Sequence, residues 1–119
     1  MDKLIKTIQE NLTDDLLRPE WRGRPEIYAG HCYVASECFY YIYGKEHGWK
    51  PMCGTKGTED LLIQTHWWLE KDDIVLDITG EQFPNGYDYS IGRKQFFMNY
   101  PSKRCKILTK RVMEWTKEV

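Results

Sequence analysis

Three residues that lie far apart in the chain carry the side chains of a thiol-based catalytic group: Cys32, His66 and Asp77. A thiol next to an imidazole can attack a carbonyl carbon, because the imidazole accepts the thiol proton. A carboxylate beside the imidazole fixes which ring nitrogen carries a proton and stabilises the imidazolium. We therefore expect Cys32 as nucleophile, His66 as general base and Asp77 as the residue that orients His66.

Two segments with alternating hydrophobicity, 61–70 and 73–79, predict that His66 and Asp77 meet. A hairpin centred on residues 71–72 places His66 directly opposite Asp77, with β-carbons about 4.5–5.5 Å apart on one face of the sheet. The other face then carries only apolar side chains, namely Trp67, Leu69, Ile74, Leu76 and Ile78. Burial of that face would hold the register and present His66 and Asp77 together on the opposite side.

Cys32 is expected in the first turn of a helix over residues 32–43. Gly30 allows a sharp entry into this helix, and Gly44 is a typical C-cap. Its apolar residues cover one broad face, which Ser36 and Glu37 interrupt. The positive end of the helix dipole stabilises negative charge, so this position is expected to favour the reactive thiolate.

A tetrahedral intermediate at Cys32 would need two hydrogen-bond donors for its oxyanion. The main-chain N–H of Cys32 is one candidate, because it opens a helix. Gln64, on the sheet face of His66, and Gln82, just after the Asp77 strand, are alternatives for the second. Two further residues have open roles. Trp68, on the His66 face, would shield the site, line a cleft or simply pack, and His31 would cap the helix, compete as a base or be exposed.

The elements around these residues predict an α+β fold. We expect a helix over 3–12, a short turn stopped by Pro19, a short strand over 49–53 and a loop over 80–92. A helical turn over 93–99 and a last helix capped by Ser102 follow. The order indicates one domain, 1–119, in which a small antiparallel sheet packs against helices.

Composition limits the kinds of partner. The chain has 119 residues, 41% of them hydrophobic, and a formal net charge of −1, which is typical of one folded domain and not of a nucleic-acid-binding protein. No apolar run approaches the roughly 20 residues of a membrane span. No export signal is visible, so we expect a cytoplasmic protein with reduced thiols, no membrane association and no nucleic acid. The basic residues of the last helix fit a solvated face: Lys103, Arg104, Lys106, Lys110 and Arg111.

The layout of a cysteine opening a helix, a histidine on a strand and an aspartate on the next strand resembles the papain-like superfamily. The intervals of thirty-four and eleven residues are similar to those of its transglutaminase-like and NlpC/P60-like branches. The resemblance covers residues 28–80 and rests on Tyr-Ala-Gly-His-Cys-Tyr-Val-Ala-Ser, Thr-His-Trp-Trp-Leu and Val-Leu-Asp-Ile-Thr. Glu26 stands where papains have an oxyanion glutamine, so the resemblance supplies no second donor.

This resemblance implies a papain-like core and acyl transfer through a thioester, without a metal or organic cofactor. The substrate would be a protein, peptide or small amide, cleaved by water or transferred to an amine. Two alternatives remain open from the residues. The first is a catalytically inactive relative that binds a protein partner through the same cleft. The second is a small zinc-binding module that uses His31, Cys32, His66 and one further cysteine.

Overall fold

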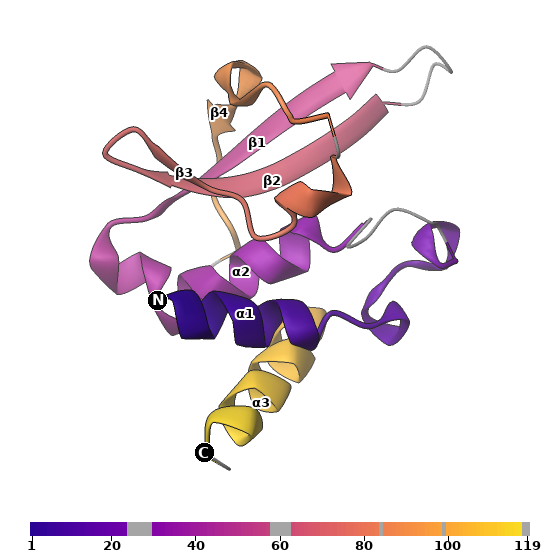
Figure 1. Ribbon diagram of the computed structural model, residues 1–119, viewed down its shortest axis with the longest axis vertical. Coiled ribbons are helices and arrows are strands. Elements are labelled where there is room, and N and C mark those ends of the chain that lie inside the picture. The colour runs from indigo at the N-terminus through magenta and orange to yellow at the C-terminus, as the bar shows by residue number, and fades with distance from the viewer. Residues whose placement is uncertain (24–29, 58–62, 84, 99, 118–119) are drawn as a thin grey trace.

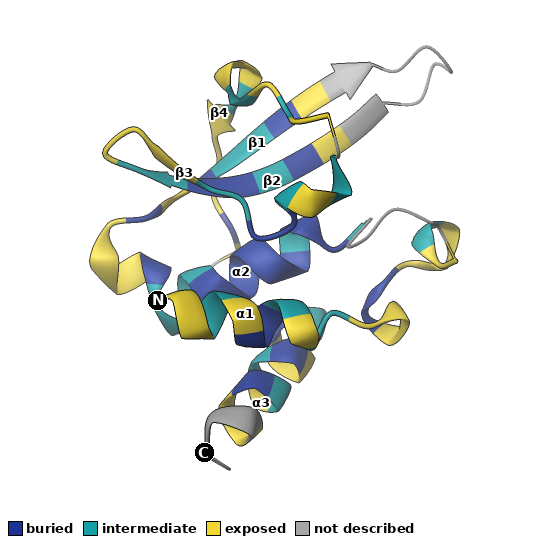
Figure 2. Ribbon diagram, in the orientation of Figure 1, coloured by how far each residue is buried: buried dark blue, intermediate teal, exposed yellow. Residues whose placement is uncertain are grey.

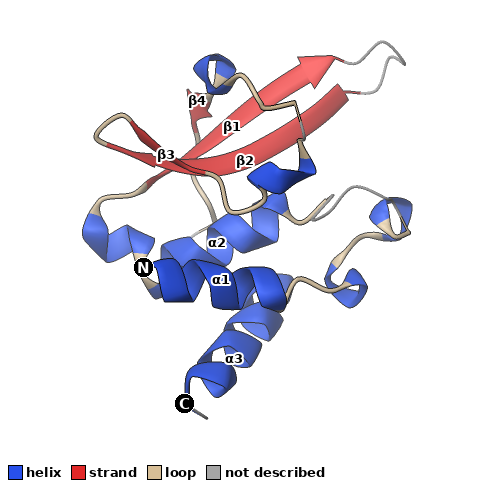
Figure 3. Ribbon diagram, viewed as in Figure 1, coloured by secondary structure: helices blue, strands red, loops and turns tan. Residues whose placement is uncertain are grey.

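A computed structural model gives the arrangement of the chain and describes residues 1–23, 30–57, 63–83, 85–98 and 100–117, without the side chains of 56–57, 63–64 and 115–117. The helices in this part are α1 (Asp2–Glu10), α2 (Cys32–Ile42) and α3 (Lys103–Lys117). The strands are β1 (Lys50–Gly57), β2 (Ile63–Lys71), β3 (Ile74–Leu76) and β4 (Arg93–Lys94). The described residues thus form the α+β fold that the sequence predicts, with helices and one antiparallel sheet packed together (Figures 1 and 3).

The sheet has the strand order β3-β2-β1-β4. The long β1–β2 hairpin is its centre and pairs Gly54 with His66. The helices gather on one side of this sheet, while the segment from η4 (Gly80–Gln82) to η5 (Tyr89–Ile91) crosses its other face (Figure 1). Side chains that point away from the helices therefore face this crossing segment. None of the helices in the described ranges is both long and apolar enough to cross a bilayer.

The hairpin between β2 and β3 forms, but its predicted register is wrong by two residues. Leu69 pairs with Leu76 and Lys71 with Ile74, so the turn is centred on Asp72 and Asp73. Both aspartates have positive φ, 50° and 64°, as a two-residue primed turn requires. Aspartate tolerates this conformation, and such turns match the twist of the strands. A shift of two keeps every side chain on its predicted face, because the side-chain period of a strand is two.

The predicted apolar face of this hairpin is confirmed only in part. Leu69 and Ile78 are buried in the core, whereas Ile74 is 60% exposed. β3 is short, and Ile74 lies directly beside the turn, beyond the helices. The core itself forms between the sheet and the helices (Figure 2). Its buried members are Ile8, Leu16, Val34, Ala35, Cys38, Phe39, Trp49, Leu69, Ile78, Phe97, Cys105, Leu108 and Val112.

The two polar residues of α2 do not interrupt its buried face, because both are buried and hydrogen-bonded. The Ser36 hydroxyl donates to the Trp67 carbonyl oxygen at 3.3 Å. The Glu37 carboxylate accepts the Ser102 N–H at 2.9 Å and the Ser102 hydroxyl at 2.6 Å. Ser102 in turn accepts the N–H of Cys105 and so caps α3, as predicted. Glu37 thereby ties the beginning of α3 to α2.

The helical turn expected over 93–99 is wrong. Arg93 and Lys94 form β4 against β1, and the N–H of Gln95 continues the pairing to the Pro51 carbonyl oxygen. In this extended segment neighbouring side chains point to opposite sides. Phe97 is buried among aromatic rings of the core, while Phe96 is 89% exposed. The open edge of β1 therefore overrides the local helical preference.

Candidate active site

Asp77 and His66 form a buried pair that packs against the crossing segment. The His66 Nε2 atom lies 2.6 Å from Asp77 Oδ2, and the two side chains are 3% and 5% exposed. Asp77 follows β3 instead of pairing directly with His66, and reaches it diagonally. The register shift of two therefore preserves the contact that the sequence predicts, since diagonal neighbours on one face remain within reach of long side chains.

Three further hydrogen bonds converge on the Asp77 carboxylate. The Tyr89 hydroxyl donates to Oδ2 at 2.6 Å, and the N–H and hydroxyl of Thr79 donate to Oδ1 at 3.2 and 3.5 Å. A carboxylate surrounded by donors is stabilised in its ionised form. Burial raises the pKa of Tyr89, and the hydrogen bond to Asp77 raises this pKa further. Tyr89 and Thr79 thus hold the carboxylate in place from two sides.

This environment fixes the tautomer of His66. An ionised carboxylate only accepts hydrogen bonds, so Nε2 carries the proton that faces Asp77. In the neutral ring Nδ1 then carries the lone pair, which accepts a hydrogen bond from the Gln82 amide nitrogen. The ring is also held from its sides by Trp68, which stacks at 5.6 Å, and by Phe83 and Tyr87 at 4.7 and 4.8 Å between ring centroids.

Gln82 is the glutamine that the structure places beside the histidine. Its Nε2 atom lies 3.5 Å from His66 Nδ1 and donates to the Thr79 hydroxyl at 2.9 Å. Gln82 also lines a pocket of about 560 Å³ together with Cys32 and His66. The side chain of Gln64, the other predicted candidate, lies outside the described residues.

Cys32 is the first residue of α2, as predicted, and Gly30 enters the helix with φ +83°. A Cβ on Gly30 would lie 2.8 Å from the Trp21 side chain, so this entry also requires the absence of a side chain. The Cys32 thiol donates to the Thr65 carbonyl oxygen at 3.8 Å. Cys32 and Ser36, one turn apart on α2, therefore contact carbonyl oxygens of alternate β2 residues.

The expectation that the helix start favours the thiolate is not met in this resting arrangement. Burial raises the pKa of the Cys32 thiol to about 11, and the negative charge of Asp77 raises it further. The backbone N–H groups of Trp67 and Tyr33 lower the pKa, but they do not offset burial. The desolvation cost of a thiolate at an 8% exposed position outweighs the helix dipole. Cys32 therefore rests as a neutral thiol.

The pocket joins the two halves of the site. Cys32 and Thr65 line it from the helix side, and His66, Gln82, Phe83 and Tyr87 line it from the sheet and the crossing segment. Arg18, Trp21, Gly30, Tyr33, Trp67, Gly86 and Arg104 complete the described lining. Its volume lies within the roughly 300–1,000 Å³ of small-molecule sites. Cys32 and His66 thus line one and the same pocket.

Two other predicted residues lie apart from this pocket. Trp68 is fully buried behind His66, and its Nε1 donates to Glu70 at 3.0 Å, so it supports the ring and does not line the pocket. His31 is 4% exposed, its Nδ1 atom has no partner within the described residues, and burial lowers its pKa against the opposing charges of Asp14 and Asp15. His31 thus lies near the turn that contains Asp14 and Asp15.

The sequence predicts no role at this site for Thr79, and it places Tyr87 and Tyr89 within the expected loop over 80–92 without a contact to Asp77 or His66. Their roles depend on how the crossing segment folds back over β2, which local patterns do not encode. The glycines of this region were the available signal. A Cβ on Gly92 would collide with Trp68, and one on Gly54 would lie 2.7 Å from the Tyr87 hydroxyl, so these positions allow the segment to lie directly on the sheet. Tyr87 reaches this layer too, and its buried hydroxyl has no partner within the described residues.

In the described part of the chain, the candidate site included, no three His, Cys, Asp or Glu residues are grouped to hold a metal ion. All four cysteines are free thiols. Comparison with known proteins gives no match to any family model, curated protein or solved structure. The chemistry of the site therefore has to be argued from its own geometry.

Proposed function

We propose that this chain is a thiol-dependent hydrolase or acyltransferase of papain-like type, with transglutaminase-like or NlpC/P60-like architecture. One observation carries the proposal. A buried carboxylate fixes the tautomer of His66, and the ring lines the same pocket as a cysteine that opens a helix. This is the division of labour that nucleophilic acyl chemistry requires. The substrate is a protein, peptide or small amide, and no cofactor takes part.

In the proposed reaction the Cys32 sulfur leaves the Thr65 carbonyl oxygen and attacks the substrate carbonyl carbon. Its proton passes to His66 Nδ1, and Asp77 stabilises the imidazolium through Nε2. The carbon–nitrogen bond then breaks, the amine takes the proton from His66, and a thioester remains on Cys32. Water or a second amine, deprotonated by His66, releases the acyl group and restores the thiol.

The high pKa of Cys32 assigns the work of deprotonation to His66 at the moment of attack. The backbone N–H groups of the first turn of α2 have no partner within their own helix and are suited to hold the oxyanion. Gln82 is the candidate for the second donor, because the residue lines the pocket and its amide nitrogen lies 3.5 Å from His66 Nδ1. Removal of an oxyanion donor costs about 100- to 1,000-fold in rate, so Gln82→Ala measures this role.

A second candidate function is favoured by the same thiol. A buried, neutral Cys32 hydrogen-bonded to a carbonyl oxygen is also what a catalytically inactive binding module would show. Such a relative would use the pocket to hold a segment of a protein partner. Acylation of Cys32 separates the two functions, because binding alone does not require a reactive sulfur.

The test uses p-nitrophenyl acetate, an activated ester that needs no specific substrate contacts. We expect a burst of p-nitrophenolate and an acetyl group on Cys32, located by mass spectrometry, and Cys32→Ser abolishes both. Cys53→Ser is the matched control, because Cys53 is a half-exposed free thiol outside the pocket lining. Equal acetylation of Cys53 and Cys32, or a burst that survives in Cys32→Ser, would favour the binding module. Peptide, isopeptide and glutamine-amide substrates then distinguish hydrolysis from transfer to an amine.

A further inference from the structure

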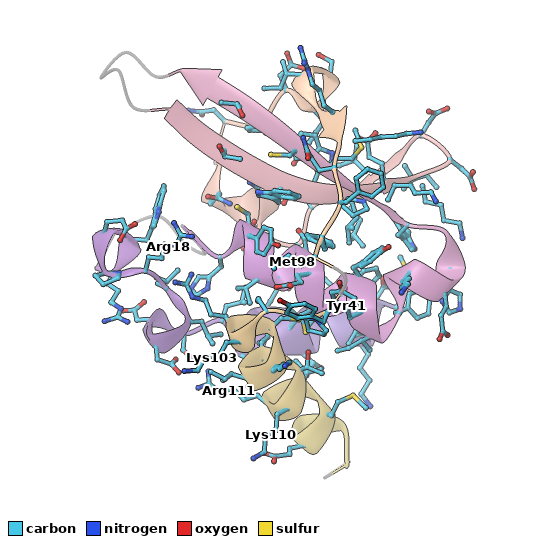
Figure 4. All side chains as sticks on the ribbon, turned by 180° about the vertical axis from the view of Figure 1, so that it is seen from behind. Arg18, Tyr41, Met98, Lys103, Lys110 and Arg111 are labelled. Atoms are coloured by element: carbon cyan, nitrogen blue, oxygen red, sulfur yellow. The ribbon has the colours of Figure 1, made fainter. Side chains whose placement is uncertain are left out.

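Two arginines line the pocket of Cys32 and His66. Arg18 immediately precedes the short turn η2 (Pro19–Trp21), and Arg104 lies in the first turn of α3. Neither element carries a member of the catalytic group. Figure 4 shows Arg18 on the side of the molecule where η2 approaches the start of α2. The pocket thus receives two positive charges from outside the catalytic elements.

Both guanidinium groups are unpaired within the described residues, where they make no hydrogen bond or ion pair. Arg111, on the same helix as Arg104, differs: it pairs with Asp15 and donates to Thr13. Figure 4 labels Lys103, Lys110 and Arg111 on α3. The charge of Arg111 is therefore compensated, whereas those of Arg18 and Arg104 are not compensated by any described residue.

The described lining of the pocket contains no Asp or Glu. The carboxylate that contacts His66, Asp77, is 5% exposed and already accepts hydrogen bonds from His66, Tyr89 and Thr79. It cannot also neutralise the arginines. An anionic ligand would therefore find two free guanidinium groups and no like charge within the described lining.

We propose that the pocket selects acyl substrates that carry a carboxylate close to the scissile amide, and that Arg18 and Arg104 bind this carboxylate. A guanidinium offers two parallel N–H groups to a carboxylate, which fixes orientation as well as charge. The substrate is an acidic peptide, with an Asp or Glu side chain or a free C-terminal carboxylate beside the reacting carbonyl. The fate of the bound acyl group rests on the proposed function, whereas its recognition does not.

Binding is tested in Cys32→Ser, which needs no catalysis. N-acetyl-glutamate methylamide and N-acetyl-glutamine methylamide differ only in charge, and the fluorescence of Trp21 and Trp67, which line the pocket, reports binding. We expect the acidic ligand to bind about tenfold more tightly, as for one charge-assisted pair, and this preference to shrink with added salt. Arg18→Ala combined with Arg104→Ala abolishes the preference. Lys110→Ala, an exposed cation on α3 outside this lining, retains it.

Equal affinities, absence of binding by both ligands, or a preference that survives in the double variant would each overturn the inference. A kinetic comparison then separates it from the proposed function. The active chain is acylated with p-nitrophenyl hydrogen adipate and with its neutral methyl ester. Acidic preference in binding without acylation of Cys32 overturns the enzyme proposal alone. Acylation by both esters at equal rates overturns the carboxylate selectivity alone.

Discussion

The sheet half of the candidate site, His66 and Asp77, is held by more contacts than the helix half, Cys32. On the sheet side, Asp77 accepts hydrogen bonds from three residues, and aromatic rings hold His66 in place. On the helix side, Cys32 has one long hydrogen bond to a carbonyl oxygen and a raised pKa. In the proposed reaction, His66 is thus oriented as a base before a ligand arrives, while Cys32 is held as a neutral thiol. Activation of the thiol would then depend on proton transfer to a ring that is already oriented.

The largest expected effect comes from a substitution in the His66–Asp77 half of the site. Asp77→Asn retains the shape of the side chain but can donate to Nε2, so the proton moves to Nδ1 and the base is lost. We expect acylation of Cys32 by p-nitrophenyl acetate to fall about 100- to 1,000-fold. Acetylation of Cys53 in the same sample is the control and stays constant. A loss below about threefold would show that the two halves are not coupled.

The second prediction concerns the Cys32 half and measures how the reactivity of the thiol depends on pH. His66→Gln keeps a donor for Asp77 but removes the base, so Cys32 reacts only as the thiolate. Because burial raises its pKa to about 11, alkylation by iodoacetamide rises about tenfold per pH unit between about pH 7 and 10. The unmodified chain reacts faster near neutrality and with a shallower slope. Identical profiles in both proteins would contradict a role of His66 at the thiol.

The third prediction removes one contact from the His66–Asp77 half and leaves its other contacts in place. Tyr89→Phe removes one of the hydrogen bonds to Asp77, which leaves the carboxylate less firmly held. We expect acylation to slow by about three- to tenfold and unfolding to cost about 1 kcal/mol less. The acylation pH profile should shift as well, which a purely structural residue would not cause. Tyr100→Phe, at an exposed position, is the matched control.

The smallest effect concerns how α2 is attached to β2. Ser36→Ala removes the hydrogen bond to Trp67 and is expected to lower the free energy of unfolding by about 1 kcal/mol, measured in urea. Acylation of Cys32 should change by less than about twofold, because Ser36 lies one turn from the pocket. A large loss of acylation would mean that this contact positions the nucleophile.

The contact between His66 and Asp77 was predictable, because the period of two along a strand survives an error in the turn. The register itself was not, since it depends on which residues adopt positive φ, and Asp72 and Asp73 do so here. The raised pKa of Cys32 also escaped prediction. The sequence predicts that Cys32 begins a helix, but its burial results from packing against β2.

The residues that complete the site were the least predictable. Tyr89 reaches Asp77 from a loop whose path depends on the close approach of Gly92 to Trp68. Glu37 reads as a polar interruption of a helix until α3 supplies Ser102 as its partner. Phe96 and Phe97 suggest a helical turn until the free edge of β1 draws the segment into the sheet. In each case a partner distant in the chain decides the outcome.

The Glu37–Ser102 contact also bears on the size of molecule that the pocket can hold. Glu37 lies five residues after Cys32 on α2, and Ser102 lies two residues before Arg104. The rise of an α-helix makes the first interval about 7.5 Å, and the carboxylate fastens its far end to α3. The Cys32 sulfur and the Arg104 guanidinium are therefore carried by two helices that are joined rigidly. Because this joint fixes the distance between them, acids with one methylene more or fewer between carboxylate and carbonyl should bind with different affinity.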